Sequence, residues 1–237
     1  MLKIRVILGS TRPGRNGEAV GSCRWSDVAV FSFHPVKIVT TAEGGMALTN
    51  DGEVADRMRM LRTHGITREP ARMQQAGGPP AAWHYEQQML GFNYRLTDLH
   101  AALGTSQLDR LEEYVQRRNM LAERYDRLLA ELPLQRPFVQ SGNRSAFHLY
   151  VVRLAGEGAE ARRRRVFDGL RARGIGVNVH YTPVHLQPYY RALGFREGLC
   201  PEAEVHGATA ITLPLYPRLS DQEQDRVVEA LDELLAS

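Results

Sequence analysis

The sequence has few cysteines and no long apolar run. Its two cysteines, Cys23 and Cys200, form neither a disulfide framework nor a metal-ligand spacing, so a reducing compartment is expected. No stretch approaches the ~20 apolar residues of a membrane-spanning helix, and the N-terminus lacks the apolar core of a signal peptide. Internal repeats and low-complexity tracts are also missing. These absences exclude a disulfide-rich secreted domain and an integral membrane protein, and they predict a soluble, cytoplasmic protein.

The charge balance gives no support to a nucleic-acid partner. Lys and Arg total 30, Asp and Glu total 27, and the formal net charge is +3. One basic run, Arg162–Arg165, falls near the start of an expected helix without interleaved aromatic residues, so we expect a solvated helix face there. With 237 residues, 43% hydrophobic and 24% charged, the chain can form one large domain or two modest ones.

Apolar periodicity predicts the secondary structure. A long helix is expected to begin with an N-cap at Thr97 or Asp98, to bend after Gly104 and to end at Leu132, before Pro133. We place the domain boundary inside it, near Arg117. Other expected helices span 53–63, 159–173 and 220–235, the last with a serine cap. Expected strands span 3–8, 27–33, 46–49, 148–154, 176–180 and 210–213, with loops at 69–80 and a loop or short helix at 183–190.

The most informative stretch runs from Phe31 to Gly45. Lys37 follows an expected strand and lies near Ser32 in the sequence, and Gly44–Gly45 permits a tight turn where backbone passes close to a ligand. A lysine that forms an imine must lose its proton, which partial burial favours, and a nearby hydroxyl can hold a phosphate. The alternative interpretation of Lys37 is a solvated loop residue.

This stretch resembles the Schiff-base segment of the DegT/DnrJ/EryC1/StrS family of sugar aminotransferases. Three more segments resemble motifs of the family in the expected order: Arg62–Ile66, Gly91–Asp98 and Leu213–Pro217. The similarity covers Gly21 to Ser237. It implies an α/β fold, the C-terminal part of a fold type I pyridoxal-phosphate transferase. A remnant of the large cofactor-binding domain would span 21–117, and a small α+β domain would span 118–237.

The resemblance also implies roles for individual residues. Lys37 would bind pyridoxal 5′-phosphate as a Schiff base and move a proton to or from the substrate carbon. Ser32 would hydrogen-bond the cofactor phosphate. Asn93 would reach that phosphate from a partner chain, flanked by Tyr94 and Arg95, so the active form would be a homodimer. Without the family, Ser32 is a strand residue, Asn93 a turn former and Arg95 a surface residue.

The stretch Val177–Tyr190 is similar to the subgroup that makes UDP-4-amino-4,6-dideoxy-N-acetyl-β-L-altrosamine. His180 and His185, together with Arg95, would contact the sugar or its diphosphate, although structural histidines are the alternative. The implied reaction moves an amino group from glutamate to C4 of a UDP-linked 4-keto-6-deoxy sugar. Some relatives perform a dehydration instead, but they carry histidine in place of the lysine, which Lys37 argues against.

The chain departs from the family ahead of Lys37. Only 36 residues precede this lysine, and no aspartate precedes Asp27. The acid that pairs with the pyridinium nitrogen therefore has no candidate at the expected place, which would weaken the cofactor as an electron sink. We expect an N-terminally truncated member of the family. The alternative to an enzyme is a non-catalytic remnant or dimer-interface module.

Residues 1–20 resemble the opening of NADPH-dependent FMN reductases instead. In those proteins a Gly-Ser-Thr-Arg loop after the first strand cradles the FMN phosphate. The matching residues here would be Ser10, Thr11, Arg12 and Arg15. Nothing after Val20 continues this likeness. We therefore expect a fused or unrelated segment at 1–20, with a flavin-binding reductase fragment as the least supported reading.

Overall fold

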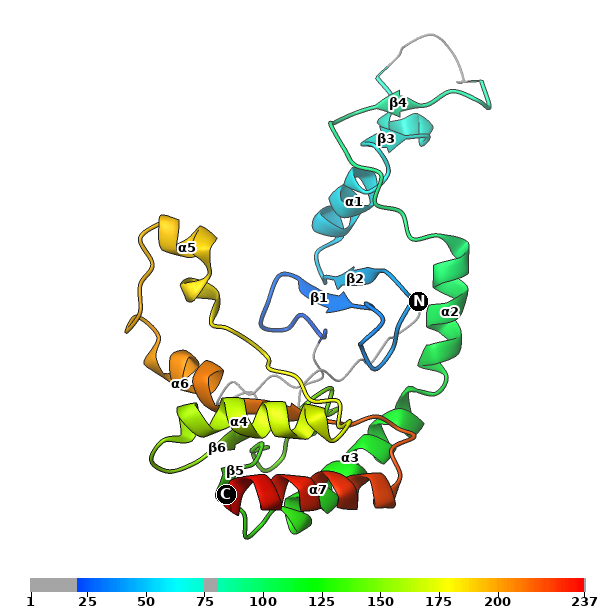
Figure 1. The fold of residues 1–237 in the computed structure, drawn as a ribbon. Helices are drawn as coiled ribbons and strands as arrows, with labels where there is room; N and C mark the ends of the chain where they lie inside the picture. The colour runs from blue at the N-terminus through cyan, green and yellow to red at the C-terminus, as the bar shows by residue number, and fades with distance from the viewer. Residues whose placement is uncertain (1–20, 75–80, 237) are drawn as a thin grey trace. The chain divides into compact units, whose positions relative to one another are not determined.

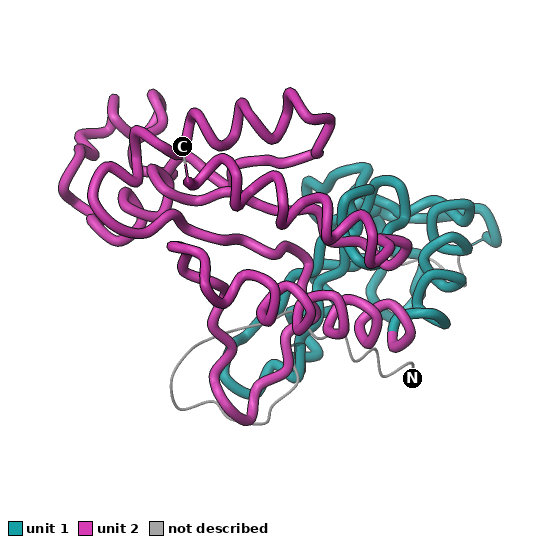
Figure 2. Tube along the Cα trace, turned by 60° about the horizontal axis from the view of Figure 1, so that its bottom comes forward, with its two compact units in different colours: residues 1–111 teal, residues 112–237 magenta. Residues whose placement is uncertain are grey.

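The computed structural model describes residues 21–74 and 81–236. The chain divides into two compact units, residues 1–111 and 112–237 (Figure 2). We expected a boundary near Arg117, six residues further along the chain. The strand expected at 3–8 and the loop that resembles an FMN site lie outside the described residues.

Unit 1 is built from short elements. Its first two strands form an antiparallel ladder from Ala29 opposite Leu48 to Ser32 opposite Gly45. Phe31, Phe33 and Val39 form its buried core. In chain order its elements are β1 (Ala29–Ser32), β2 (Gly45–Leu48), α1 (Gly52–Leu61), β3 (Ile66–Thr67), η1 (Pro70–Arg72), β4 (Glu86–Gln87) and α2 (Asp98–Leu108) (Figure 1).

Local capping explains where the helices of unit 1 begin. The carboxylate of Asp51 accepts hydrogen bonds from the backbone N–H of Glu53 at 2.8 Å and Val54 at 3.1 Å. Thr97 Oγ1 accepts from the N–H of His100 at 3.3 Å. Both caps satisfy backbone donors that the first turn of a helix leaves without partners. Thr97 is therefore the N-cap of α2, one of the two residues expected from the sequence.

Unit 2 has a larger core around a three-stranded antiparallel sheet with the order β5-β6-β7. Helices α4 and α7 lie side by side (Figure 1). In chain order the elements are α3 (Leu111–Leu128), β5 (Leu134–Gln135), β6 (Tyr150–Leu154), α4 (Ala159–Ala172), η2 (Val184–Leu186), α5 (Pro188–Ala192), α6 (Pro201–Thr209), β7 (Ala210–Leu213) and α7 (Asp221–Ala236).

The serine cap expected at the last helix is confirmed. Ser220 Oγ accepts from the N–H of Glu223 at 3.2 Å, and the Glu223 carboxylate accepts from the N–H of Ser220 at 2.7 Å. This reciprocal pair is a capping box. The pKa of Glu223 is lowered, chiefly by the Ser220 N–H, because the hydrogen bond stabilises the charged carboxylate.

Two expected elements are wrong. The single helix from 98 to 132 is two helices, α2 and α3, separated at Asp109–Arg110, and Gly104 lies inside α2 rather than at the break. Leu108 and Leu111, on either side of the break, both pack against the Phe31 cluster. The strand expected at 176–180 is reduced to one bridge between Asn178 and Thr212. Val177 of this stretch is buried in a loop instead of in a sheet.

The basic run on α4 is only half a solvated face. Arg164 and Arg165 are exposed as expected. Arg162 and Arg163 instead donate hydrogen bonds to the carbonyl oxygens of Ala155 and Ala208. None of the helices in the described part of the chain combines the length and the apolar character that crossing a membrane requires.

Candidate functional site

The Lys37 loop, residues 33–44, connects β1 to β2. Its two ends are joined because the N–H of Phe33 donates to Gly44 O at 2.9 Å and the N–H of Thr41 donates to Phe33 O at 3.0 Å. Thr40 Oγ1 donates to the same Phe33 carbonyl at 3.0 Å. Within the loop, the N–H of Lys37 donates to His34 O at 2.9 Å. These bonds hold the half-buried Lys37 in a tight turn.

Polar side chains gather on this loop and at the end of β1. Ser32 is the exposed last residue of β1, and its Oγ accepts from the N–H of His34 at 3.4 Å. His34 Nδ1 accepts from the N–H of Val36 at 3.4 Å, and His34 Nε2 lies 4.0 Å from a Glu43 oxygen. A hydroxyl, an imidazole and an amine therefore lie on one short segment. The structure thus brings Ser32 and Lys37, two of the expected site residues, into the same loop region.

The packing of the Lys37 loop itself requires the paired glycines Gly44 and Gly45. A Cβ at Gly45 would lie 2.7 Å from the carbonyl oxygen of Phe31, across the β1–β2 ladder. A Cβ at Gly44 would lie 2.4 Å from Thr41 Oγ1, and the φ of Gly44 is +154°. Side chains at either position would collide with neighbours that cannot all move. We expected these glycines to allow approach of a ligand, whereas they are already required for the loop itself.

Two motifs that are distant in sequence form one paired segment in unit 1. The N–H of His64 donates to Phe92 O at 2.8 Å, and the N–H of Tyr94 donates to Arg62 O at 2.9 Å. Gly65 and Gly91 allow this approach, since a Cβ at Gly65 would lie 1.9 Å from Met89 O. We call residues 89–95 the Asn93 segment. Backbone hydrogen bonds hold it against residues 61–65.

The side chains of the Asn93 segment face outward. Asn93, Tyr94 and Arg95 are all exposed. The rings of Phe92 and Tyr94 stack with centroids 4.9 Å apart and an interplanar angle of 11°. Asn93 and Arg95 thus belong to unit 1, as Ser32 and Lys37 do, on a separate segment.

The two expected substrate histidines belong to unit 2 and have different surroundings. His180 is half-buried, and its Nδ1 lies 2.7 Å from Thr212 Oγ1. Its ring meets the exposed Tyr181 edge-on, with centroids 4.5 Å apart. His185 is only 8% exposed, and its Nε2 lies 2.7 Å from Glu204 Oε1. A buried ring nitrogen with a carboxylate partner favours the structural alternative for His185.

Glu204, which the sequence did not single out, organises this region. Besides His185, its carboxylate accepts hydrogen bonds from the N–H groups of Gly198, at 2.9 Å, and Cys200, at 3.3 Å. The pKa of Glu204 is lowered, first by the Gly198 N–H and then by His185, because each stabilises the charged form. One carboxylate on α6 thus joins both ends of the exposed segment that contains α5. A single glutamate on a helix gives no sequence signal for such a role.

The Leu213–Pro217 motif is bound through its backbone carbonyls. Arg118 donates to Leu215 O at 2.8 Å, and Arg117 donates to Pro217 O at 3.3 Å. The Tyr125 hydroxyl donates to Pro214 O at 3.1 Å. All three donors come from α3. This motif therefore has a structural explanation, the attachment of the chain after β7 to α3.

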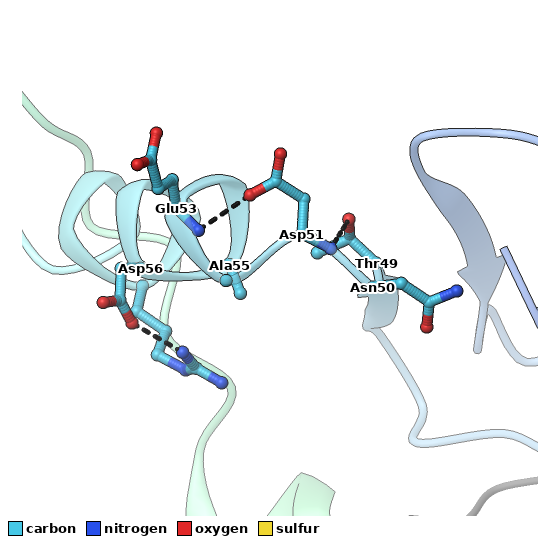
Figure 3. Close-up of a pocket in the computed structure, with 8 residues that line it drawn as sticks. Thr49, Asn50, Asp51, Glu53, Ala55 and Asp56 are labelled. Atoms are coloured by element: carbon cyan, nitrogen blue, oxygen red, sulfur yellow. Dashed lines mark hydrogen bonds and ion pairs between the residues drawn. The ribbon is translucent and has the colours of Figure 1, made fainter.

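A hollow of about 780 Å³ opens at the start of α1 (Figure 3), and none of the expected site residues lines it. Two of its carboxylates already have partners. Asp51 caps the helix, and Asp56 pairs with Arg59 and with Arg72. The pKa of Asp56 is lowered, first by its hydrogen bond from Arg72. The hollow is lined by Thr49, Asn50, Asp51, Gly52, Glu53, Ala55, Asp56 and Arg59.

Known proteins resemble this chain over almost all of its length. The sequence pattern of the DegT/DnrJ/EryC1/StrS aminotransferase family matches residues 8–232, so the match begins inside the segment that resembles an FMN reductase. The spore coat polysaccharide biosynthesis protein SpsC of Bacillus subtilis (strain 168) is 37% identical over 212 residues, 88% of this chain and 54% of that protein.

Solved structures show the same extent of likeness. Spr1654 from Streptococcus pneumoniae, in its PMP form, is 34% identical with a TM-score of 0.81, covering 91% of this chain and 54% of that one. Helicobacter pylori PseC, an aminotransferase involved in the biosynthesis of pseudoaminic acid, is 28% identical with a TM-score of 0.80, covering 90% and 54%. These likenesses confirm the expected α/β fold. The chain spans about half the length of the relatives it matches.

Proposed function

Because this chain belongs to the DegT/DnrJ/EryC1/StrS aminotransferase family, we propose that it provides the lysine-bearing part of a pyridoxal 5′-phosphate-dependent sugar aminotransferase. The observation that carries the proposal is the Lys37 loop. Its backbone hydrogen bonds hold the half-buried Lys37 in a fixed turn. The exposed Ser32, with its hydroxyl, lies at the end of the preceding strand β1. Preorganisation of this kind is what a lysine that binds a carbonyl requires.

The residues of the loop fit the chemistry of the cofactor. Lys37 Nζ would hold the aldehyde carbon of pyridoxal phosphate and later carry a proton to or from the substrate carbon. Ser32 Oγ would donate to the phosphate, and Asn93 of a second copy would reach the same group. When bound, the cofactor supplies an electron sink for the carbon that exchanges the amino group. Ser32, Lys37 and Asn93 are therefore our candidate cofactor ligands.

For the substrate, we propose a UDP-linked 4-keto-6-deoxy sugar that receives an amino group at C4, with glutamate as the amino donor. The likeness of the stretch 177–190 to the altrosamine-forming subgroup supports this choice, as does the similarity to PseC. Arg95 would pair with the diphosphate, since a guanidinium matches phosphate oxygens. Of the histidines, His180 is our candidate for the sugar. For His185 we favour the structural role, because its Nε2 contacts Glu204.

Borohydride reduction tests the cofactor proposal directly. Lys3 and Lys37 are the only lysines of the chain, so a reduced cofactor has few possible attachment points. We expect the purified chain, incubated with pyridoxal phosphate and then reduced, to carry the cofactor on the peptide that contains Lys37. Replacing Lys37 by arginine should abolish this label, because the guanidinium does not form the imine. Peptide mass spectrometry provides the measurement.

The matched control for Lys37→Arg is Lys3→Arg, which should leave the label at Lys37 unchanged. Equal labelling of Lys3 and Lys37 would mean that pyridoxal phosphate reacts with any accessible amine, and it would remove the proposal. A chain that takes up no cofactor would instead support the second candidate, a non-catalytic module of such an enzyme. That candidate rests on the extent of the match, since the chain spans 54% of SpsC.

We also propose that the chain forms a homodimer through the surface around the Asn93 segment. Leu90 is 87% exposed, Tyr94 74% and Leu99 84%, although all three side chains are apolar or aromatic. Large apolar side chains left exposed in this way commonly mark an interface. A second copy is the occupant that would bring Asn93 to the cofactor phosphate of its neighbour.

Replacing Leu99 by glutamate should shift the chain from dimer to monomer, because a charge in the centre of an apolar interface is poorly solvated. Sedimentation equilibrium would measure the mass, for which one chain is 26.7 kDa. The control is Leu193→Glu, which changes another exposed leucine, 61% exposed, in unit 2. A wild-type chain that sediments as a monomer at all concentrations would contradict the dimer.

A further inference from the structure

Helix α2 packs tightly against the Lys37 loop at Gly104. Gly104 is the buried residue of this helix. A Cβ built on Gly104 would lie 2.7 Å from Thr41 Cγ2. Apart from the adjacent residues and the backbone of α2 itself, no other atom lies within 4 Å of that Cβ. Real side chains do not approach so closely, so glycine is required as long as Thr41 keeps its place. A glycine inside a helix otherwise weakens it relative to alanine.

Thr41 is also fixed by hydrogen bonds within its own loop. It is only 2% exposed. Its Oγ1 donates to Glu43 O at 2.8 Å, and its N–H donates to Phe33 O at 3.0 Å. The hydroxyl therefore faces its own loop while the methyl group faces α2. This side chain joins the Lys37 loop to the helix through packing rather than through charge.

A second contact links the same loop to the start of α2. A Cβ at Gly44 would lie 2.9 Å from Leu96 Cδ1, so the loop also passes close to the residue that joins the Asn93 segment to the Thr97 cap. Leu108, at the other end of α2, packs against the Phe31 cluster. The helix thus touches the loop region near its start, at its centre and at its end.

We propose that Thr41 and Gly104 are positioning residues, which fix the Lys37 loop against α2 and so hold the Lys37 amine in place for the cofactor. The inference deepens the proposed function and rests on it for the role of Lys37. The packing itself does not depend on any cofactor. Because one methyl group fills the space that a Cβ at position 104 would need, the two residues must be coupled.

A double-mutant cycle on the full cofactor-free chain tests the coupling. Gly104→Ala should accelerate amide exchange in residues 33–44 by roughly ten- to a hundredfold, the range expected from overpacking a tight contact. Thr41→Ser removes the methyl but keeps the hydroxyl that donates to Glu43 O. Combined with Gly104→Ala, it should restore exchange to within about threefold of the Thr41→Ser chain.

The matched control is Gly52→Ala on α1, because a Cβ at Gly52 has open space around it. It should leave exchange in the Lys37 loop unchanged. If Gly104→Ala slows exchange in the loop, or if Thr41→Ser does not relieve its effect, the positioning role is overturned.

Borohydride labelling of the same four chains separates this inference from the proposed function. With both correct, the label at Lys37 should fall in Gly104→Ala and recover in the double variant. Absence of label in the wild-type chain, with the exchange pattern intact, would sink the cofactor proposal and reduce Thr41 and Gly104 to packing residues without a positioning role. Full labelling of Gly104→Ala despite a loosened loop would contradict the positioning role alone.

Discussion

Gly65→Ala is expected to separate the Asn93 segment from residues 62–66. A Cβ at this position would lie 1.9 Å from the backbone oxygen of Met89, and the φ of Gly65 is +68°, where an L side chain is strained. Backbone cannot rotate away as a flexible side chain would. We expect a loss of about 3 kcal/mol or more in the free energy that holds the pairing, because overpacking and left-handed strain add.

Amide exchange at His64, Phe92 and Tyr94 measures this loss, since their N–H groups make the pairing hydrogen bonds. The control is Gly142→Ala, because Gly142 also has a positive φ, +84°, but open space around its Cβ. It carries the conformational strain without the collision. Equal protection of the three amides in Gly65→Ala and wild type would mean that the backbone approach is not as tight as described. The proposed dimer surface should be lost together with the pairing, because Tyr94 and Leu90 lie on this segment.

The second large effect is expected from Arg118→Met. Arg118 is only 7% exposed, and its guanidinium donates to the carbonyl oxygens of Phe147, His148 and Leu215 at 3.0, 3.3 and 2.8 Å. Burial lowers the pKa of this guanidinium, because desolvation disfavours its charge. Methionine fills similar space but leaves three carbonyls without this donor. We expect unit 2 to lose about 3 kcal/mol of stability, roughly 1 kcal/mol for each acceptor.

Exchange of the amides of β6 and β7 during native-state unfolding would measure the stability of unit 2. Arg164→Met is the matched control, since the side chain of Arg164 is 89% exposed and pairs only with Asp168 across one turn. It should cost little. Arg118→Lys should recover part of the loss, because it restores one charged donor group without the fork. If Arg118→Met is as stable as Arg164→Met, the donated hydrogen bonds contribute nothing measurable.

Local sequence signals predicted the ends of several elements. Ser220 before an amphipathic run is a start signal that acts within one turn, and α7 begins there. The family was also predicted correctly, because four motifs in order constrain more than any single one. Neither signal needs knowledge of contacts between distant residues, which is why sequence alone suffices for them.

The features that the sequence did not predict depend on distant contacts. Gly65 approaches Met89, and Gly104 approaches Thr41, across many residues of sequence. A glycine in a sequence does not indicate which distant residue it will contact. Helix α6 has no clear apolar face, so periodicity did not indicate it. The apolar residues of 176–180 suggested a strand, but Val177 is buried in a loop rather than in a sheet.

Within unit 2, the region that contains α5 is attached through Glu204 and is separate from the core. Residues 187–203 are all exposed, so none of them is needed to fill the core beneath the sheet. The Glu204 carboxylate binds His185, just before this region, and Gly198 within it. Substitutions between these two anchors are therefore expected to leave the sheet intact. This part of unit 2 could change its surface chemistry without a change of fold.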